Sequence, residues 1–250
     1  MPSTPEALRT VDRLRRQLRN WERARGTGSP AATGPAVATE IEAVDRLLPA
    51  GGYRAGSLVE WLAEGEGTGA ATLALSCAGA SLHDGRRLIV VDDARNFHPP
   101  ALPATIDPER IVVVRPRTLP DAWWAIEQSL RCRGATVTLA WVKRADDRTL
   151  RRWQLAAEQG GGVGLLLRPV AARRTPSWAE SRWLVEPLPS FSESHGRRWR
   201  LELLHGRGRS TLRAVPPGGV VELEQDHETG AVRVASRLAV AETAGRAAGA

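Results

Sequence analysis

Residues 60–73 read EWLAEGEGTGAATL, an apolar run followed by a glycine-rich turn and an Ala/Leu stretch. This order predicts a strand, a tight turn and a helix that extends over 70–82. In such a turn, backbone N–H groups and a helix N-terminus converge on one point, which is how many proteins hold a phosphate group. The candidate phosphate-contacting residues are therefore Gly65, Gly67, Gly69 and Thr72.

The loop departs from the P-loop motif G-x-x-x-x-G-K-[ST] at the positions that carry its chemistry. With Gly69 as the last glycine, Glu64 stands in place of the first. Ala70 and Ala71 replace the lysine and the magnesium-binding hydroxyl. The only lysine of the chain, Lys143, lies on a different predicted strand, so we expect that it cannot supply the missing charge. We therefore expect no ATP hydrolysis and no bound cofactor, and interpret the loop as vestigial.

A second interpretation of the loop is a dinucleotide-binding fingerprint. The pattern G-x-G-x-x-A spans Gly65–Ala70, and Asp92 and Asp93 end the next predicted strand, where an acid that binds ribose would stand. These two acids are also well placed to cap the turn after that strand. The fingerprint normally lies near the start of its domain, whereas residues 1–64 precede it here. An NAD(P)-binding Rossmann-type enzyme is therefore kept as an alternative.

Short apolar runs and helical patterns alternate along the chain. Strands are predicted at 57–62, 87–91, 110–114, 136–142 and 163–168. Further helices are predicted at 121–131, capped by Asp121, and from Asp146–Asp147 to 159. After Pro169 only β-like runs occur, at 182–186, 198–204, 210–215, 220–224 and 231–235. This order predicts an α/β fold, with a mainly parallel sheet, helices on both faces and an antiparallel C-terminal extension.

The composition excludes several classes of protein. With 42% hydrophobic and 25% charged residues, the chain is not extensively disordered. No window approaches the ~20 apolar residues of a membrane span, and the Arg-rich start lacks the apolar core of a secretory signal. Cys77 and Cys132 are too few for a disulfide scaffold or a structural zinc site, and the histidines lack metal-ligand spacing. We therefore expect a soluble, cytoplasmic protein without a metal site.

Two arginine-rich blocks carry local charges of +4 and +5, within a net charge of +7 for the whole chain. Residues 1–30 hold seven Arg against three acidic residues, and residues 195–213 hold six Arg against one. Such blocks favour contact with a polyanion or an acidic protein, although solvated surface explains them equally well. Trp178, Trp183 and Trp199 lie nearby, where they either stack on single-stranded bases or pack against edge strands. The candidate contact residues are Arg13, Arg16, Arg173, Arg174, Arg197, Arg198 and Arg200.

Composition and periodicity divide the chain into four parts. Residues 1–26 read as a basic amphipathic helix, and residues 27–39, rich in Gly, Ser, Pro and Ala, read as a linker. Residues 40–238 hold the α/β core with its antiparallel strands, and residues 239–250 read as a flexible tail.

Several segments resemble the RecA recombinase family and, over the whole chain, the ImuA proteins. Residues 44–60, VDRLLPAGGYRAGSLVE, resemble the lead-in to the RecA P-loop, and 91–99 and 106–108 resemble the segments downstream of that loop. The degenerate loop, together with WVKR at 141–144 and LRRWQLAAE at 150–158, resembles the ImuA proteins. The resemblance implies a RecA-like P-loop fold. It also implies the role of an accessory protein in damage-induced, error-prone translesion DNA synthesis.

The resemblance also implies partners and a lack of catalysis. The partners are an ImuB-like Y-family polymerase homologue and an error-prone C-family DNA polymerase, with RecA or DNA as further candidates. Where RecA-type enzymes have a water-activating Glu and a magnesium-binding Asp, this chain has Ala94 and Trp141. The first interpretation is therefore a non-catalytic scaffold, with the indole of Trp141 in the place of metal and phosphate. The alternatives are a RecA-like DNA-dependent ATPase with unusual ligands and, from the family's SulA-like label, a cell-division inhibitor.

Overall fold

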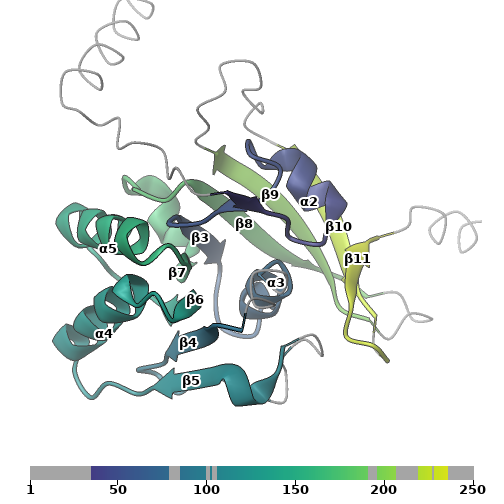
Figure 1. Ribbon diagram of the computed structural model, residues 1–250. Coiled ribbons are helices and arrows are strands. Elements are labelled where there is room, and N and C mark those ends of the chain that lie inside the picture. Colours follow the sequence, from purple (N-terminus) through teal and green to yellow (C-terminus); the bar gives the residue numbers. More distant parts are fainter. Residues whose placement is uncertain are drawn as a thin grey trace, which may run out of the picture. The chain divides into compact units, whose positions relative to one another are not determined.

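In the described residues, a nine-stranded mixed sheet forms the centre of the molecule (Figure 1). The computed structural model describes residues 35–78, 85–99, 102, 106–190, 196–206, 219–226 and 228–235. Outside these ranges lie the predicted helix at 1–26, linker residues 27–34, the run at 210–215 and the tail at 239–250, together with Arg13 and Arg16. Within the described ranges, no helix is long and apolar enough to cross a membrane.

Six adjacent strands of the sheet run parallel to one another. In spatial order they are β8 (Ser181–Leu188), β3 (Leu58–Ala63), β7 (Val163–Pro169), β6 (Ala135–Trp141), β4 (Arg87–Val91) and β5 (Ile111–Val114). Every residue of β3 is buried, as expected for a strand that is covered on both faces. The predicted fold class, α/β with a mainly parallel sheet, is confirmed, and it is compatible with a RecA-like fold.

Three further strands extend the sheet in antiparallel pairing: β9 (Arg198–Gly206), β10 (Gly219–Gln225) and β11 (Val232–Val234). The prediction that the antiparallel extension begins at 182–186 is wrong, because this run lies in β8, which pairs in parallel with β3. A parallel neighbour requires a crossover connection. Residues 170–180, which include the 3₁₀ helix η4 (Val170–Arg174), form it without an α-helix.

Helices cover both faces of the sheet (Figure 1). On one face, α2 (Glu42–Leu47) and α3 (Ala70–Ser76) pack in one apolar cluster. On the other face, α4 (Leu119–Arg131) and α5 (Asp147–Gly160) pack in a second cluster. Helix α3 ends well before the predicted end at 82. Two small elements complete the fold: the antiparallel pair β1 (Ala36–Val37) and β2 (Tyr53–Arg54), and the 3₁₀ helix η3 (Pro108–Arg110).

The first residues of α4 and α5 test the two predicted N-caps. The prediction for Asp121 is wrong: α4 begins two residues earlier, and its cap is Thr118, whose Oγ1 accepts the Asp121 N–H at 3.3 Å. Pro120 in the first turn favours this earlier start, since its fixed φ suits a helix and its missing N–H is not needed there. The prediction for Asp146 is confirmed: its Oδ1 accepts the Thr149 N–H at 2.7 Å, and the hydrogen bonds from Thr149 lower the pKa of Asp146.

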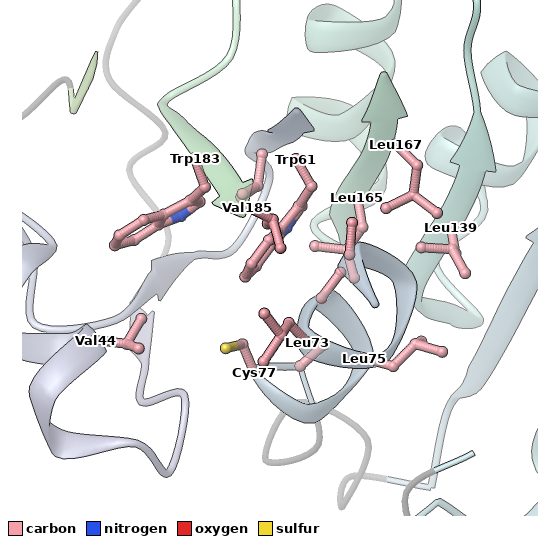
Figure 2. Packing of buried hydrophobic residues seen from close by; sticks show 14 of the residues in the cluster. Val44, Trp61, Leu73, Leu75, Cys77, Leu139, Leu165, Leu167, Trp183 and Val185 are labelled. Carbon is pink, nitrogen blue, oxygen red and sulfur yellow. The ribbon is translucent and has the colours of Figure 1, made fainter. Parts of the chain in front are cut away.

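The apolar cluster in which α3 packs contains two stacked indoles (Figure 2). The ring centroids of Trp61 in β3 and Trp183 in β8 lie 6.0 Å apart at an interplanar angle of 25°. Leu73 and Cys77, within and at the end of α3, lie close to them and are fully buried. Burial raises the pKa of the Cys77 thiol to about 12. Cys77 is therefore a core residue that stays protonated near neutral pH.

Candidate binding site

A cavity of about 1050 Å³ opens at the carboxyl edge of the parallel strands. Its wall includes the ends of β3, β6 and β7, the glycine-rich loop after β3 and the turn after β4. Ligands bind at this edge in many α/β proteins, because the loops that follow parallel strands meet there. Most of the wall is apolar and includes the large side chains of Phe97, Trp123, Trp141 and Leu167. The cavity is therefore the candidate functional site.

The glycine-rich loop forms one side of this cavity. Four candidate residues from the sequence line it: Gly65, Gly67, Gly69 and Thr72. Gly69 has a φ of +87° and lies against Trp199 of β9, so that a Cβ at position 69 would come within 2.3 Å of the indole Nε1. The same indole N–H donates a hydrogen bond to the carbonyl of Thr68 at 2.8 Å. The antiparallel extension therefore holds the loop in its conformation.

The residues around the loop do not fit a magnesium–nucleotide complex of the RecA type. Ala70 and Ala71 offer neither an ammonium group nor a hydroxyl in the first turn of α3. At the end of β6, Trp141 contributes an indole to the wall instead of a carboxylate. Within the part of the chain that the structure describes, no group of three or more His, Cys, Asp or Glu side chains could hold a metal ion.

Asp92, directly after β4, has a structural role at this edge. Its side chain is fully buried. Its two carboxylate oxygens accept the backbone N–H groups of Asn96 at 2.7 Å and Phe97 at 3.1 Å. The turn-capping interpretation of Asp92 is thereby confirmed. The Asn96 side chain in turn donates to the Glu66 carboxylate at 3.1 Å, which ties this turn to the glycine-rich loop.

Lys143 is not remote from the loop. It follows β6 and lines the same cavity as Gly65–Thr72, together with its neighbour Arg144. The expectation that the only lysine lies too far away is therefore wrong. Strands β3 and β6 both flank β7 in parallel, so their carboxyl ends meet at one edge. The predicted alternation of strands and helices already implied that Lys143 and the loop lie at the same edge of the sheet, because the carboxyl ends of parallel strands all lie at one edge.

A buried charge cluster lies beside the cavity, and sequence reasoning missed it. Glu60, in the middle of β3, is fully buried. Its Oε1 accepts a hydrogen bond from Arg168 Nη1 at 2.6 Å, and its Oε2 accepts one from Arg182 Nε at 2.7 Å. Arg182 also donates to the carbonyls of Arg173 and Thr175. The sequence did contain one signal for this cluster. Glu60 is a charged residue at the centre of an apolar strand, and a buried charge requires a partner.

Three of the candidate arginines lie at or near the cavity. Arg197 lines it and is exposed. Arg173 and Arg174 are exposed at the end of η4, next to Ala172 and Thr175, which line the cavity. These three side chains are placed where a ligand or partner at this edge would meet them.

The other two described candidates are engaged within the sheet. Arg198 is 8% exposed and pairs with Glu222 at 3.2 Å. Arg200 is more exposed and lies 3.9 Å from Glu186. Arg198 is therefore a structural residue of β9, and a role in partner contact is not supported for it.

The tryptophans among these arginines are mostly core residues. Trp183 and Trp199 are fully buried, so neither indole is available to stack on a base. Trp178 donates its Nε1–H to Asp147 Oδ1 at 2.8 Å, and the guanidinium of Arg151 lies 4.5 Å from the centroid of its ring. Of the two interpretations from the sequence, packing is therefore correct for Trp183 and Trp199.

Comparison with known proteins identifies relatives along nearly the whole chain. The sequence is 30% identical to Protein ImuA of Caulobacter vibrioides strain NA1000 / CB15N, over 246 residues that cover 90% of this chain and 97% of the relative. Protein ImuA of strain ATCC 19089 / CIP 103742 / CB 15 of that species matches to the same extent. No family model matches the chain.

Proposed function

This chain belongs to the ImuA family, and we propose that it is a non-catalytic, RecA-like accessory protein of damage-induced, error-prone DNA synthesis. One observation carries the proposal. The site at the carboxyl edge keeps a large, mostly apolar cavity, but it lacks the lysine and hydroxyl of a P-loop and has an indole at the end of β6. A large, mostly apolar cavity at this edge is suited to holding another molecule.

The proposed partners are those that the family resemblance implies. They are an ImuB-like Y-family polymerase homologue and an error-prone C-family DNA polymerase, with RecA or DNA as further candidates. The positive charge at the cavity edge, on Lys143, Arg144 and Arg197, supports contact with an acidic surface or a polyanion. In this function the protein brings the polymerases together and performs no chemistry itself.

Co-purification and an ATPase assay test the proposal together. The full chain is expressed with both polymerases, and purified chain is assayed for ATP hydrolysis with and without single-stranded DNA. We expect a complex with at least one polymerase and no hydrolysis above background. DNA-stimulated hydrolysis that disappears in Gly69→Asp would overturn the proposal, as would the absence of any polymerase from the purified material.

A second candidate function, nucleotide binding with unusual ligands, is favoured by one observation. Lys143 and the glycine-rich loop line the same cavity, so a lysine is available to an anion at this edge despite its absence from the loop. Equilibrium binding of a fluorescent ATP analogue to the full chain tests this function. Saturable binding that is lost in Lys143→Ala would favour it, and no binding at millimolar protein would exclude it.

A further inference from the structure

The cavity has a surplus of positive side chains. Four cationic residues line it: Lys143, Arg144, Arg168 and Arg197. The acidic residues that line it are Glu66 and Asp146. Both carboxylates accept hydrogen bonds from neutral groups, Glu66 from the Asn96 side chain and Asp146 from the backbone N–H of Thr149, and both keep their negative charge. The four lining cations therefore outnumber the two lining carboxylates.

The buried charge cluster of Glu60, Arg168 and Arg182 adds to this surplus of positive charge. Arg168 lines the cavity although it is only 5% exposed. It shares the single carboxylate of Glu60 with Arg182, so two guanidinium groups face one negative charge. In the described part of the chain, Arg168 Nε is buried without a hydrogen-bond partner. A negative charge placed in the cavity would balance the positive charge that this cluster leaves over.

The apolar wall of the cavity favours a ligand that carries an apolar group beside its negative charge. Phe97, Trp123, Trp141 and Leu167 line a volume of about 1050 Å³. Small-molecule sites usually enclose about 300–1,000 Å³. A volume just above this range, with aromatic walls, suits large side chains presented by another protein. Aromatic and other large anchors that fill such pockets contribute most of the energy of protein–protein binding.

Long parts of this chain outside the described residues lack the charge to occupy the site. Residues 1–30 hold seven Arg against three acidic residues. Residues 207–218 hold Arg207, Arg209 and Arg213 and no acid, and residues 236–250 hold two Arg against one Glu. Charge complementarity therefore favours a segment of another protein over these segments.

We infer that the cavity is a docking site for a peptide segment of a partner protein, in which acidic residues flank a large apolar side chain. The apolar side chain enters between the aromatic walls. The acidic residues of the peptide pair with Lys143, Arg144 and Arg197 at the edge of the cavity. They also balance the positive charge of the buried Arg168. This inference rests on the proposed function, because it gives the proposed scaffold the surface by which it holds its partner.

A peptide selection on the full chain tests the docking site. A random 12-residue display library is selected against the immobilised protein, and the enriched peptides are measured by fluorescence anisotropy. Lys143→Glu reverses a charge at the cavity edge. Arg133→Glu is the matched control, because Arg133 is exposed between α4 and the start of β6, at the opposite edge of the sheet.

We expect enriched peptides that combine Asp or Glu with Trp, Phe or Leu. Their Kd should rise about tenfold or more on Lys143→Glu and change less than about twofold on Arg133→Glu. No enrichment, or equal affinity for Lys143→Glu and the parent, would overturn the inference. Tighter binding of ATP or of an oligothymidylate, with displacement of the peptides, would also overturn it by identifying a different occupant.

The same variants separate this inference from the proposed function. If both polymerases co-purify with Lys143→Glu as well as with the parent while the selection fails, the docking site is wrong and the scaffold function stands. If acidic peptides bind in the expected way but no polymerase co-purifies, the docking site stands and the proposed function fails.

Discussion

The two ends of the central strand β3 differ in the pairing of their buried charged side chains and in the surroundings of the glycine that lies near each end. At the amino end, Arg54 pairs with Glu180 at 3.0 Å, one cation to one carboxylate. At the carboxyl side, Glu60 faces two arginines beside an open cavity. At the amino end one guanidinium faces one carboxylate, whereas at the carboxyl side two guanidinium groups face one carboxylate beside the cavity. The carboxyl side therefore holds the excess of positive charge on which the proposed docking site depends.

The largest effect is expected from Glu60→Gln. This change leaves Arg168 and Arg182 buried without their carboxylate, and removing one partner of a buried charge cluster costs about 3–5 kcal/mol. Urea unfolding followed by tryptophan fluorescence measures the loss. Glu186→Gln is the control, since Glu186 pairs with Arg200 at the surface and should change stability by about 1 kcal/mol or less. A similar loss in both variants would contradict the assigned role of the buried cluster.

Two glycines at opposite ends of β3 give the next comparison. In Gly69→Ala the φ of +87° is strained and the new Cβ meets the indole of Trp199, which together cost about 2–4 kcal/mol. In Gly56→Ala the φ of +80° is also strained, but the nearest atom, Glu158 Cα, lies 3.2 Å away, so about 1–2 kcal/mol is expected. Thermal unfolding measures the difference. If both variants lose the same stability, the contact with Trp199 does not hold the loop.

The Glu180 carboxyl at the amino end should make stability depend on pH. Burial raises the pKa of Glu180 to about 7, despite the nearby Arg54. Because this pKa lies above that of the unfolded chain, the native state binds more protons between about pH 4.5 and 7, and the stability contributed by Glu180 falls as pH rises through that window.

Glu180→Gln removes this dependence. The free energy of unfolding of the variant, relative to the parent, should therefore increase by about 1 kcal/mol or more between pH 4.5 and 7.5. Urea unfolding at several pH values measures it. A difference between variant and parent that stays constant with pH would contradict the raised pKa.

The smallest effect on stability is expected from the charges at the cavity edge. Lys143 and Arg133 are both exposed, so Lys143→Glu and Arg133→Glu should each change the free energy of unfolding by less than about 0.5 kcal/mol. Equal melting temperatures of the two variants would show that any difference in peptide affinity arises at the docking site. A marked loss in Lys143→Glu alone would show that this lysine supports the fold instead.

The candidate site was only partly accessible from sequence. The loop at 65–72 and the turn cap at Asp92 were found, because each depends on neighbours in the chain. Lys143 was judged remote, and Glu60 was read as part of a strand and of the RecA-like lead-in without its arginine partners, because their roles depend on strand order. Arg198 was grouped with surface arginines, although its pairing with Glu222 buries it.

The sequence by itself determined the alternation of strands and helices, the replacement of the P-loop lysine and hydroxyl by Ala70 and Ala71, and the excess of basic residues. These features depend on local patterns, in which periodicity, turn residues and motif positions lie close together in the chain. Only the tertiary structure decided that β8 is parallel to β3, that the indole of Trp199 holds Gly69, and that Lys143 shares a cavity with the loop. The physical reason is that each depends on which strands are neighbours, and side chains far apart in the chain set that order together.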